Sequence, residues 1–361
     1  MERNRIYSLD LLKFIVSIVI VVLHIQQESR IGLSVINLAS GKIYTWYIVE
    51  LLFIISGFLS MLYFSSDEKI ELSLQNGFSL YLKHKCIRIY PMVILSTIFY
   101  LLNIVLYKLF FKYWLHNIVP GLWRVLNSIL LTNEGSISYF NSPTWYLSVL
   151  LLCYCFEYFI VFLCKRMTLK IEYFFVAMVL LGITGYCYGL NLPLLSYHTC
   201  RGYASFFIGC LIYKLYNNQK IKIKRILIGS IIAFTFCVIA GIVDFNLFYD
   251  DETCQWGVFT VILNPSIFII FLESNRWFKS SKWQILGNIS FEIYLFHMPF
   301  IILYLIFCDL CPKMCISEML QISIFIVLMI IISFIIFTFI EKPITRKLSN
   351  RFEKNQDLQK E

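Results

Sequence analysis

The chain has 361 residues, of which 59% are hydrophobic and 15% charged, and its formal net charge is +9. A soluble globular domain carries about 25% charged residues, so this chain has too little polar surface to be one. We therefore predict a polytopic, all-α integral membrane protein, with one membrane domain over residues 1–345 and a short cytoplasmic tail over residues 346–361.

The N-terminal stretch has a basic start and an apolar core, as a secretory signal does. A cleavable signal ends in small residues, whereas this apolar run ends in HIQQE, which begins at His24. We therefore interpret it as a retained first membrane helix.

Spanning a bilayer takes about 20 mostly apolar residues in a helix. Runs of this kind predict about ten transmembrane helices, at residues 9–27, 44–64, 89–111, 144–164, 171–190, 201–216, 225–243, 256–273, 284–307 and 318–341. Residues 65–84 mix polar and apolar side chains and are expected at the inner surface. Residues 112–143 form a long outer connection, of a length that is more often functional than a short turn.

The distribution of Lys and Arg gives the orientation, because cytoplasmic loops carry the excess of these residues. With the N-terminus inside, 24 of the 31 Lys and Arg residues fall on the inner side and seven outside. Both termini are therefore predicted to be cytoplasmic, and the acidic segment Asp244–Glu252 to be external. The topology explains the positive charge, so we expect no nucleic-acid partner. The expected partner is the lipid bilayer.

Ionisable side chains inside membrane helices are costly and mark candidate functional sites. Lys13 and His24 are eleven residues apart, which places them within about 20° of one another on one helix face and about 16 Å apart along it. Lys13 could instead extend to lipid phosphates, and His24 could bond to a neighbouring helix.

Two further runs carry such residues. Tyr294 and His297 share a face of the predicted ninth helix, where they could relay protons or simply satisfy polar groups between helices. Glu50 lies in the second helix on the same face as Gly57. Gly57 would let a ligand or another backbone approach closely, and helix packing is the alternative explanation for this glycine.

Lys85 and Arg88 lie in KHKCIRIYP, at the cytoplasmic mouth of the third helix. Arg can bind a phosphate through two parallel hydrogen bonds, so this cluster is a candidate anion site; a basic collar facing lipid headgroups is the alternative. Cys308, Cys311 and Cys315 form a dense run, for which a metal or a disulfide is an alternative to ordinary loop cysteines. We expect no metal.

Together these strings resemble the acyltransferase 3 family of bacterial membrane acyltransferases. The resemblance extends from residue 6 to about residue 347 and rests on YSLDLLKFIVSIVIVVLH, VELLFIISGFLS, KHKCIRIYP, PTWYLSVLLLCY, ISFEIYLFHMPF and IEKPITRKL. It implies a membrane domain of ten core helices that transfers an acyl group, and not an aminoacyl group, from acyl-CoA to envelope sugars or small molecules.

The resemblance also implies roles for particular residues. His24 matches the family's proposed catalytic histidine and Lys13 its basic partner, while the family's R-x-x-R string is Lys85-Cys-Ile-Arg88 here. The Lys replacing the first Arg loses bidentate recognition at that position. Some relatives carry an additional extracytoplasmic domain that completes transfer; without one, this chain is expected to finish the transfer alone or to pass the acyl group to a partner.

The function that the resemblance implies is O-acylation, most simply O-acetylation, of a cell-envelope or exopolysaccharide sugar at the bacterial plasma membrane. Lys13, Lys85 and Arg88 would hold the phosphates of acetyl-CoA or another acyl-CoA, and His24 would act as general base or transient acyl carrier. Glu50 and the Tyr294–His297 pair would orient it or relay protons. The expected partners are a carbohydrate acceptor and either a second copy of the chain or polysaccharide-assembly proteins. The rival hypothesis is a proton-coupled transporter or flippase of a sugar-containing solute.

Overall fold

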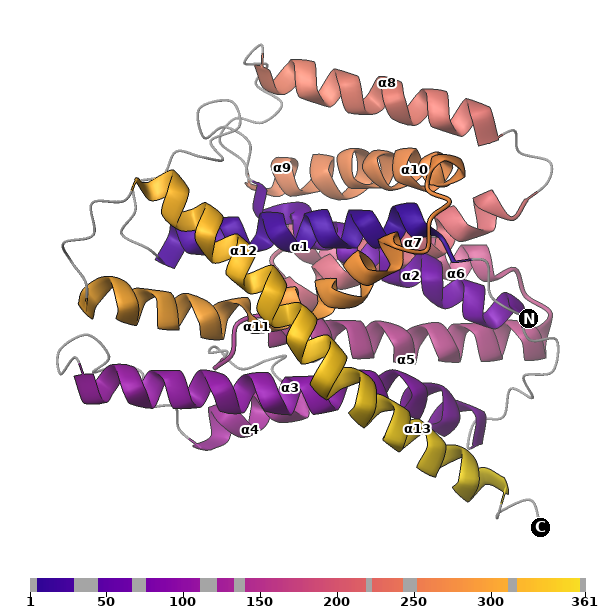
Figure 1. Cartoon of the computed structure of the whole chain (residues 1–361). Coiled ribbons are helices and arrows are strands. Elements are labelled where there is room, and N and C mark those ends of the chain that lie inside the picture. The colour runs from indigo at the N-terminus through magenta and orange to yellow at the C-terminus, as the bar shows by residue number, and fades with distance from the viewer. Residues whose placement is uncertain are drawn as a thin grey trace.

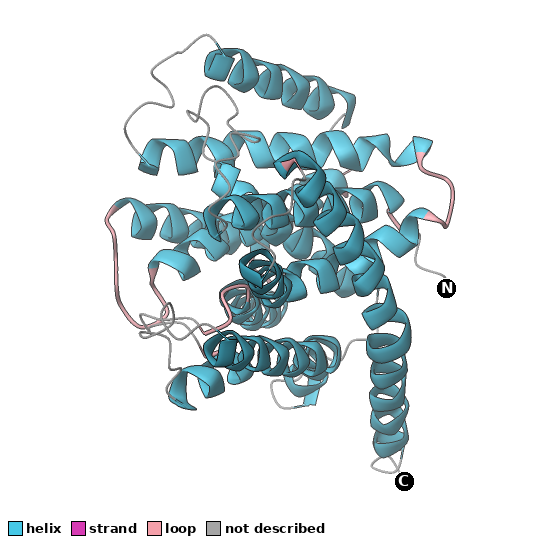
Figure 2. Cartoon of the chain, turned by 60° about the vertical axis from the view of Figure 1, so that its left-hand side comes forward, coloured by secondary structure: helices cyan, strands magenta, loops and turns pink. Residues whose placement is uncertain are grey.

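The structure is a computed structural model that describes residues 5–28, 45–66, 76–110, 122–132, 140–218, 223–242, 252–310 and 317–357. Within these ranges the regular structure is helical and no strand forms (Figure 2). The predicted all-α class is therefore confirmed for the part of the chain that is described.

Most of the helices run along one common direction, while the last continuous stretch crosses the others obliquely (Figure 1). The first part of the chain forms α1 (Tyr7–Glu28), α2 (Val49–Ser66), α3 (Asn76–Phe110), α4 (Leu122–Leu130), α5 (Thr144–Met167), α6 (Ile171–Cys187) and α7 (Tyr197–Tyr216). The second part forms α8 (Ile223–Ile242), α9 (Glu252–Val258), the π-helical turn η3 (Phe259–Leu263), α10 (Asn264–Ser274), α11 (Trp283–Leu310), α12 (Glu318–Ile336), the π-helical turn η5 (Phe337–Glu341) and α13 (Lys342–Asp357).

Six helical stretches among the described residues are long and apolar enough to cross a membrane, fewer than the ten predicted. They are Tyr7–Ile25, Gly77–Phe110, Thr144–Met167, Glu252–Trp277, Trp283–Leu310 and Met319–Phe352. Three shorter apolar helices cover Val49–Phe64, Ile171–Cys187 and Arg225–Ile239.

Helix α7 overlaps the predicted range 201–216 but is not among the six. It packs against α2, α5 and α6, and 13 of its residues are buried. A helix enclosed by other helices needs no apolar face toward lipid, so it can carry Arg201 and several small residues.

Two predicted connections are more helical than expected. Residues 76–84 of the expected surface segment are the first turns of α3, because no helix breaker separates them from Arg88; Pro91 lies inside the helix. The long connection at residues 112–143 contains α4, which packs on α3. The predicted tail is also helical as far as Asp357. It is part of α13, which continues α12 through η5.

Helix α11 is the central packing partner of α1, and glycine permits their close approach. A Cβ at Gly287 would collide with the Asp10 carboxylate. A Cβ at Gly57 would likewise collide with the Phe206 carbonyl oxygen at the α2–α7 contact. These glycines let the backbones come close enough to place side chains of different helices in one site.

Pro299 also fixes the position of α11. It has no N–H, so it leaves the Leu295 carbonyl without its helical partner. The Ser96 hydroxyl of α3 donates to that oxygen at 2.8 Å, and the Asn103 amide donates to the Pro299 oxygen at 2.7 Å. These bonds hold α3 against the segment of α11 that carries His297.

Candidate active site

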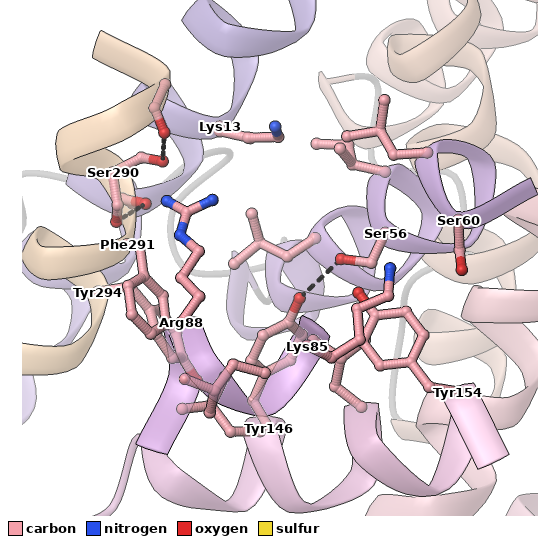
Figure 3. Close-up of a pocket in the computed structure, with 18 of the residues that line it drawn as sticks. Lys13, Ser56, Ser60, Lys85, Arg88, Tyr146, Tyr154, Ser290, Phe291 and Tyr294 are labelled. Atoms are coloured by element: carbon pink, nitrogen blue, oxygen red, sulfur yellow. Dashed lines mark hydrogen bonds between the residues drawn. The ribbon is translucent and has the colours of Figure 1, made fainter. Parts of the chain in front are cut away.

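A cavity of about 300 Å³ lies between α1, α2, α3, α5 and α11. Three of the described residues that line it are cationic: Lys13, Lys85 and Arg88 (Figure 3). Its apolar wall is formed by Leu52, Ile55, Leu59, Ile89, Leu147 and Leu150. The structure thus brings all three predicted donor-binding residues to one cavity.

Lys13 is held by an acid on its own helix. Its Nζ lies 3.7 Å from Oδ1 of Asp10, a side chain that is almost fully buried. Asp10 also accepts from Arg5 at 2.6 Å, and Arg5 donates to Asn288 of α11 at 2.8 Å. This network ties the beginning of α1 to α11 and fixes the cation at the cavity.

Arg88 is held by an acid from the other end of the sequence. Its Nε donates to Oε1 of Glu341 at 3.0 Å, and Glu341 is 3% exposed in the π-helical turn η5. Because this bond uses Nε, the two Nη groups remain available to bind an oxyanion in the cavity. Buried Glu292 of α11 interacts with Glu341, so two carboxyl groups lie behind one guanidinium.

Lys85 lies over aromatic rings. Its Nζ is 4.2 Å from the ring centroid of Tyr154 and 5.3 Å from that of Tyr81. The Tyr81 hydroxyl donates to the buried carboxylate of Glu157 at 2.8 Å, and Ser60 donates to the same oxygen. A ring face attracts an ammonium group, so these tyrosines help to hold Lys85 at the cavity.

Each of the three cations therefore has a buried acid in its neighbourhood: Asp10 for Lys13, Glu341 for Arg88 and Glu157 for Lys85. A cluster of cations inside an apolar bundle would repel itself without such partners. The acids lie behind the cations, which leaves the cavity side positive and suited to an anionic group.

The cavity also reaches Tyr146 and Tyr294. The Tyr294 hydroxyl donates to the Pro143 carbonyl oxygen at 3.0 Å, and its ring packs against that of Tyr146 with 5.3 Å between centroids. The ring of Tyr294 also lies near that of His297, at 5.9 Å between ring centroids.

His297 is fully buried, and its Nδ1 bonds to the Tyr294 carbonyl oxygen. A carbonyl only accepts, so this geometry assigns the proton to Nδ1 and leaves a lone pair on Nε2. Within the described residues, that Nε2 has no hydrogen-bond partner. The ring of His24 lies against it, with 4.9 Å between centroids and 32° between planes.

The predicted site residues therefore fall into three groups. Lys13, Lys85 and Arg88 line the cavity, Tyr294 lines its wall, and the histidine pair lies behind Tyr294 and does not line it.

Glu50 lies elsewhere. Its Oε1 accepts from Arg201 at 2.6 Å and from the Trp256 indole at 3.1 Å, and the guanidinium of Arg201 packs over Trp145 and two tyrosine rings. The idea that Glu50 works with the Tyr294–His297 pair finds no support in these contacts. A buried acid on α2 has to pair with a cation, and the one that reaches it is on α7.

Sequence reasoning missed Glu341 and Arg201, and it gave Glu157 no role. Glu341 ends the last apolar run within IEKP, and Arg201 begins the run that becomes α7. Both are charges at the edge of an apolar run, a signal that could have been used. Their partners, however, are more than 150 residues away in the sequence.

The described residues contain no group of three or more His, Cys, Asp or Glu side chains arranged to hold a metal ion. Cys311 and Cys315 lie outside these residues, so the possibility of a metal or disulfide in that run stays untested.

Residues 6–338 match the family model described as an acyltransferase domain, acyltransferase 3. The chain belongs to the acyltransferase 3 family. This match covers nearly the whole sequence and, with the apolar helices, identifies a membrane acyltransferase. No curated protein and no solved structure matched the chain.

Proposed function

We propose that this acyltransferase moves an acyl group, most simply acetyl, from cytoplasmic acyl-CoA to a hydroxyl of a cell-envelope or exopolysaccharide sugar in the bacterial plasma membrane. One observation carries the proposal. A cavity lined by three cations includes Tyr294 in its wall, the ring of Tyr294 lies beside His297, and His297 lies against His24.

The cationic part of the cavity suits the donor's phosphates. Arg88 offers two Nη groups, while Lys13 and Lys85 contribute compact charges from two other directions (Figure 3). The apolar wall between these cations and Tyr294 suits the thin pantetheine arm, which carries the thioester away from the phosphates.

His24 is partly exposed, whereas His297 is fully buried, so His24 is the ring that an acceptor can reach. In the proposed step His24 takes the proton of the sugar hydroxyl as its oxygen attacks the thioester carbonyl. The C–S bond then breaks, and the thiolate of CoA leaves with the proton that His24 took, which returns His24 to its neutral form. The products are an O-acyl sugar and free CoA.

His297 orients and supports this base. Two imidazolium rings at 4.9 Å repel each other, so the pair favours a single positive charge. The lone pair on Nε2 of His297 can share a proton with its neighbour, because its Nδ1–H is already held by the backbone.

Tyr294 separates the cavity from the histidines, so the thioester must pass it. Its hydroxyl bond to Pro143 is a single contact, and a change of rotamer would break it. We infer that this side chain moves when the donor binds, which joins the cavity to the histidine pair.

The topology belongs to the same proposal. Ten membrane passages with both termini cytoplasmic place Lys13, Lys85 and Arg88 toward the cytoplasm, where acyl-CoA is found, and His24 toward the outer half of the membrane. The direction of α1 and the excess of basic residues at the predicted inner segments support this arrangement.

The decisive experiment is to incubate the purified protein with acyl-labelled CoA and candidate glycan acceptors. Label on the acceptor, with release of free CoA, is the expected result. Release of CoA without acceptor labelling would indicate hydrolysis, and sugar movement across vesicles without either would favour the transporter. Mass analysis of envelope glycans from cells with and without the protein would identify the acceptor.

A further inference from the structure

A second cavity, of about 420 Å³, lies between the ends of α2, α5 and α7, away from the candidate active site. Met61, Phe64, Val161 and Tyr213 form its buried wall. It shares no lining residue with the cavity of Lys13 and Arg88. Nothing in the proposed transfer reaction uses it.

Two lysines line this cavity. Lys165 is in the last turn of α5, and Lys214 is in the last turn of α7. Among the described residues neither forms an ion pair, in contrast to Lys13 and Arg88. Lysines in a last turn also complement the helix dipole, but that role requires no cavity.

Among the described residues that line this cavity, two are cationic and none is acidic. Glu172, in the first turn of α6, is the only acid in residues 58–66, 160–176 and 208–218, which contain its lining. The same ranges contain four basic residues, Lys165, Arg166, Lys170 and Lys214, while outside them Glu273 of α10 lies near Tyr216 at the end of α7. An occupant should therefore carry negative charge next to an apolar body.

Position favours a lipid over a soluble anion. Helix α5 ends on the side of the bundle where α1 begins, on the right in Figure 1. Leu169, which lines the cavity, is 45% exposed, so the cavity opens beside an apolar side chain at the surface. Basic pockets between membrane helices at this level bind anionic headgroups.

We propose that the cavity between α2, α5 and α7 binds an anionic phospholipid, whose phosphate is held by Lys165 and Lys214 and whose acyl chain lies on Met61 and Phe64. This site is separate from acyl transfer, so it stands whether or not the proposed reaction is correct. It would tie the ends of three helices to the anionic leaflet.

Native mass spectrometry of the full chain, titrated with phosphatidylglycerol or phosphatidylcholine, tests this. We expect phosphatidylglycerol to bind about tenfold more tightly, since each surface lysine adds roughly a several-fold gain for anionic lipid. The double variant Lys165→Gln/Lys214→Gln should lose that preference. The variant Lys279→Gln/Lys282→Gln removes the same charge from residues that do not line the cavity. This variant should keep the preference for phosphatidylglycerol.

Three results would overturn the proposal. Equal binding of the two lipids would show that the site does not recognise an anionic headgroup. An equal loss of preference in both double variants would show that the preference comes from general surface charge. Inorganic phosphate that competes as well as the lipid would mean that the site takes a soluble anion. If the first double variant is unstable, the single variants Lys165→Gln and Lys214→Gln should each show part of the loss.

Discussion

The rings of His24 and His297 lie 4.9 Å apart between centroids, although 272 residues of sequence separate the two histidines. His24 comes from α1 and His297 from α11, and these two helices pack closely along their length. Any chemistry assigned to His24 therefore has to include the second imidazole.

The first prediction concerns the base. His24→Gln keeps a hydrogen-bonding side chain but loses basicity, so transfer should fall by at least about 10²-fold while the protein stays folded and binds donor. Steady-state transfer rates, donor binding and melting temperature measure these three properties. Near-normal turnover in a well-folded His24→Gln protein would remove the catalytic assignment.

His297 provides a separable test. His297→Gln should lower kcat less than His24→Gln does and should change its dependence on pH, because the ring supports the base without contacting the acceptor. A pH–rate profile of each variant distinguishes the roles. If the two substitutions have equal effects and identical profiles, the histidines act as one unit and the order of roles proposed here is wrong.

The second prediction concerns Arg88 and Glu341. Arg88→Ala should raise the donor KM about tenfold or more, because charge-assisted bonds to phosphate contribute about 1.5–3 kcal/mol. Glu341→Gln should also raise the donor KM, by a smaller factor, because the bond at 3.0 Å to Nε orients the guanidinium. Kinetics with the acceptor held at saturation measure both.

Asp309→Asn is the matched control, because the Tyr107–Asp309 bond of 3.1 Å also joins α3 to α11. It should leave the donor KM unchanged. The side chain of Arg88 is 48% exposed, so loss of its ion pair should change stability by less than about 1 kcal/mol. A large drop in melting temperature for Glu341→Gln, with an unchanged donor KM, would make the pair structural.

The third prediction concerns the boundary between the cavity and the histidines. Tyr294→Phe keeps the ring but loses the bond to the Pro143 carbonyl oxygen, so the side chain should move more easily. We expect a small change in donor KM and an increase in CoA release without acceptor, because the thioester is less well shielded. Unchanged hydrolysis in both Tyr294→Phe and Tyr294→Ala would show that this residue does not separate the two compartments.

The fourth prediction concerns helix packing. Gly57→Ala should lower the melting temperature in detergent, since its Cβ would meet the Phe206 backbone; overpacking of this kind costs about 1–3 kcal/mol. Gly229→Ala is the control, because nothing lies within 4 Å of its added Cβ. Equal melting temperatures for the two variants would show that α2 and α7 are not packed this closely.

The fifth prediction concerns topology. In the proposed topology 24 of the 31 basic residues fall in the inner segments, so single cysteines or reporters at both termini should be inaccessible from outside the cell, and one within residues 244–252 should be accessible. An externally labelled C-terminus would mean either an odd number of membrane passages, if the N-terminus is inside, or a reversed orientation, if the N-terminus is outside as well.

The sequence by itself determined the membrane class, the family and the helical state of the apolar runs, because each is a local or additive property, although only six stretches of the described residues are long and apolar enough to span, not ten. Apolar runs predict helices without knowledge of their neighbours, and the period of 3.6 residues predicts that Lys13 and His24 share a face. Lys13, Lys85 and Arg88 could also be selected, because charge inside or beside an apolar run is unusual wherever the helix packs.

Only the tertiary structure decided which charges meet. Periodicity gives the face of a helix but not the helix opposite it, so the pairs Arg88–Glu341 and Glu50–Arg201 could not be predicted. Helix order and depth in the bundle are set by long-range packing. The close approach at Gly287 and the carbonyl freed by Pro299 fix α11 against α1 and α3, and they thereby place His297 beside His24.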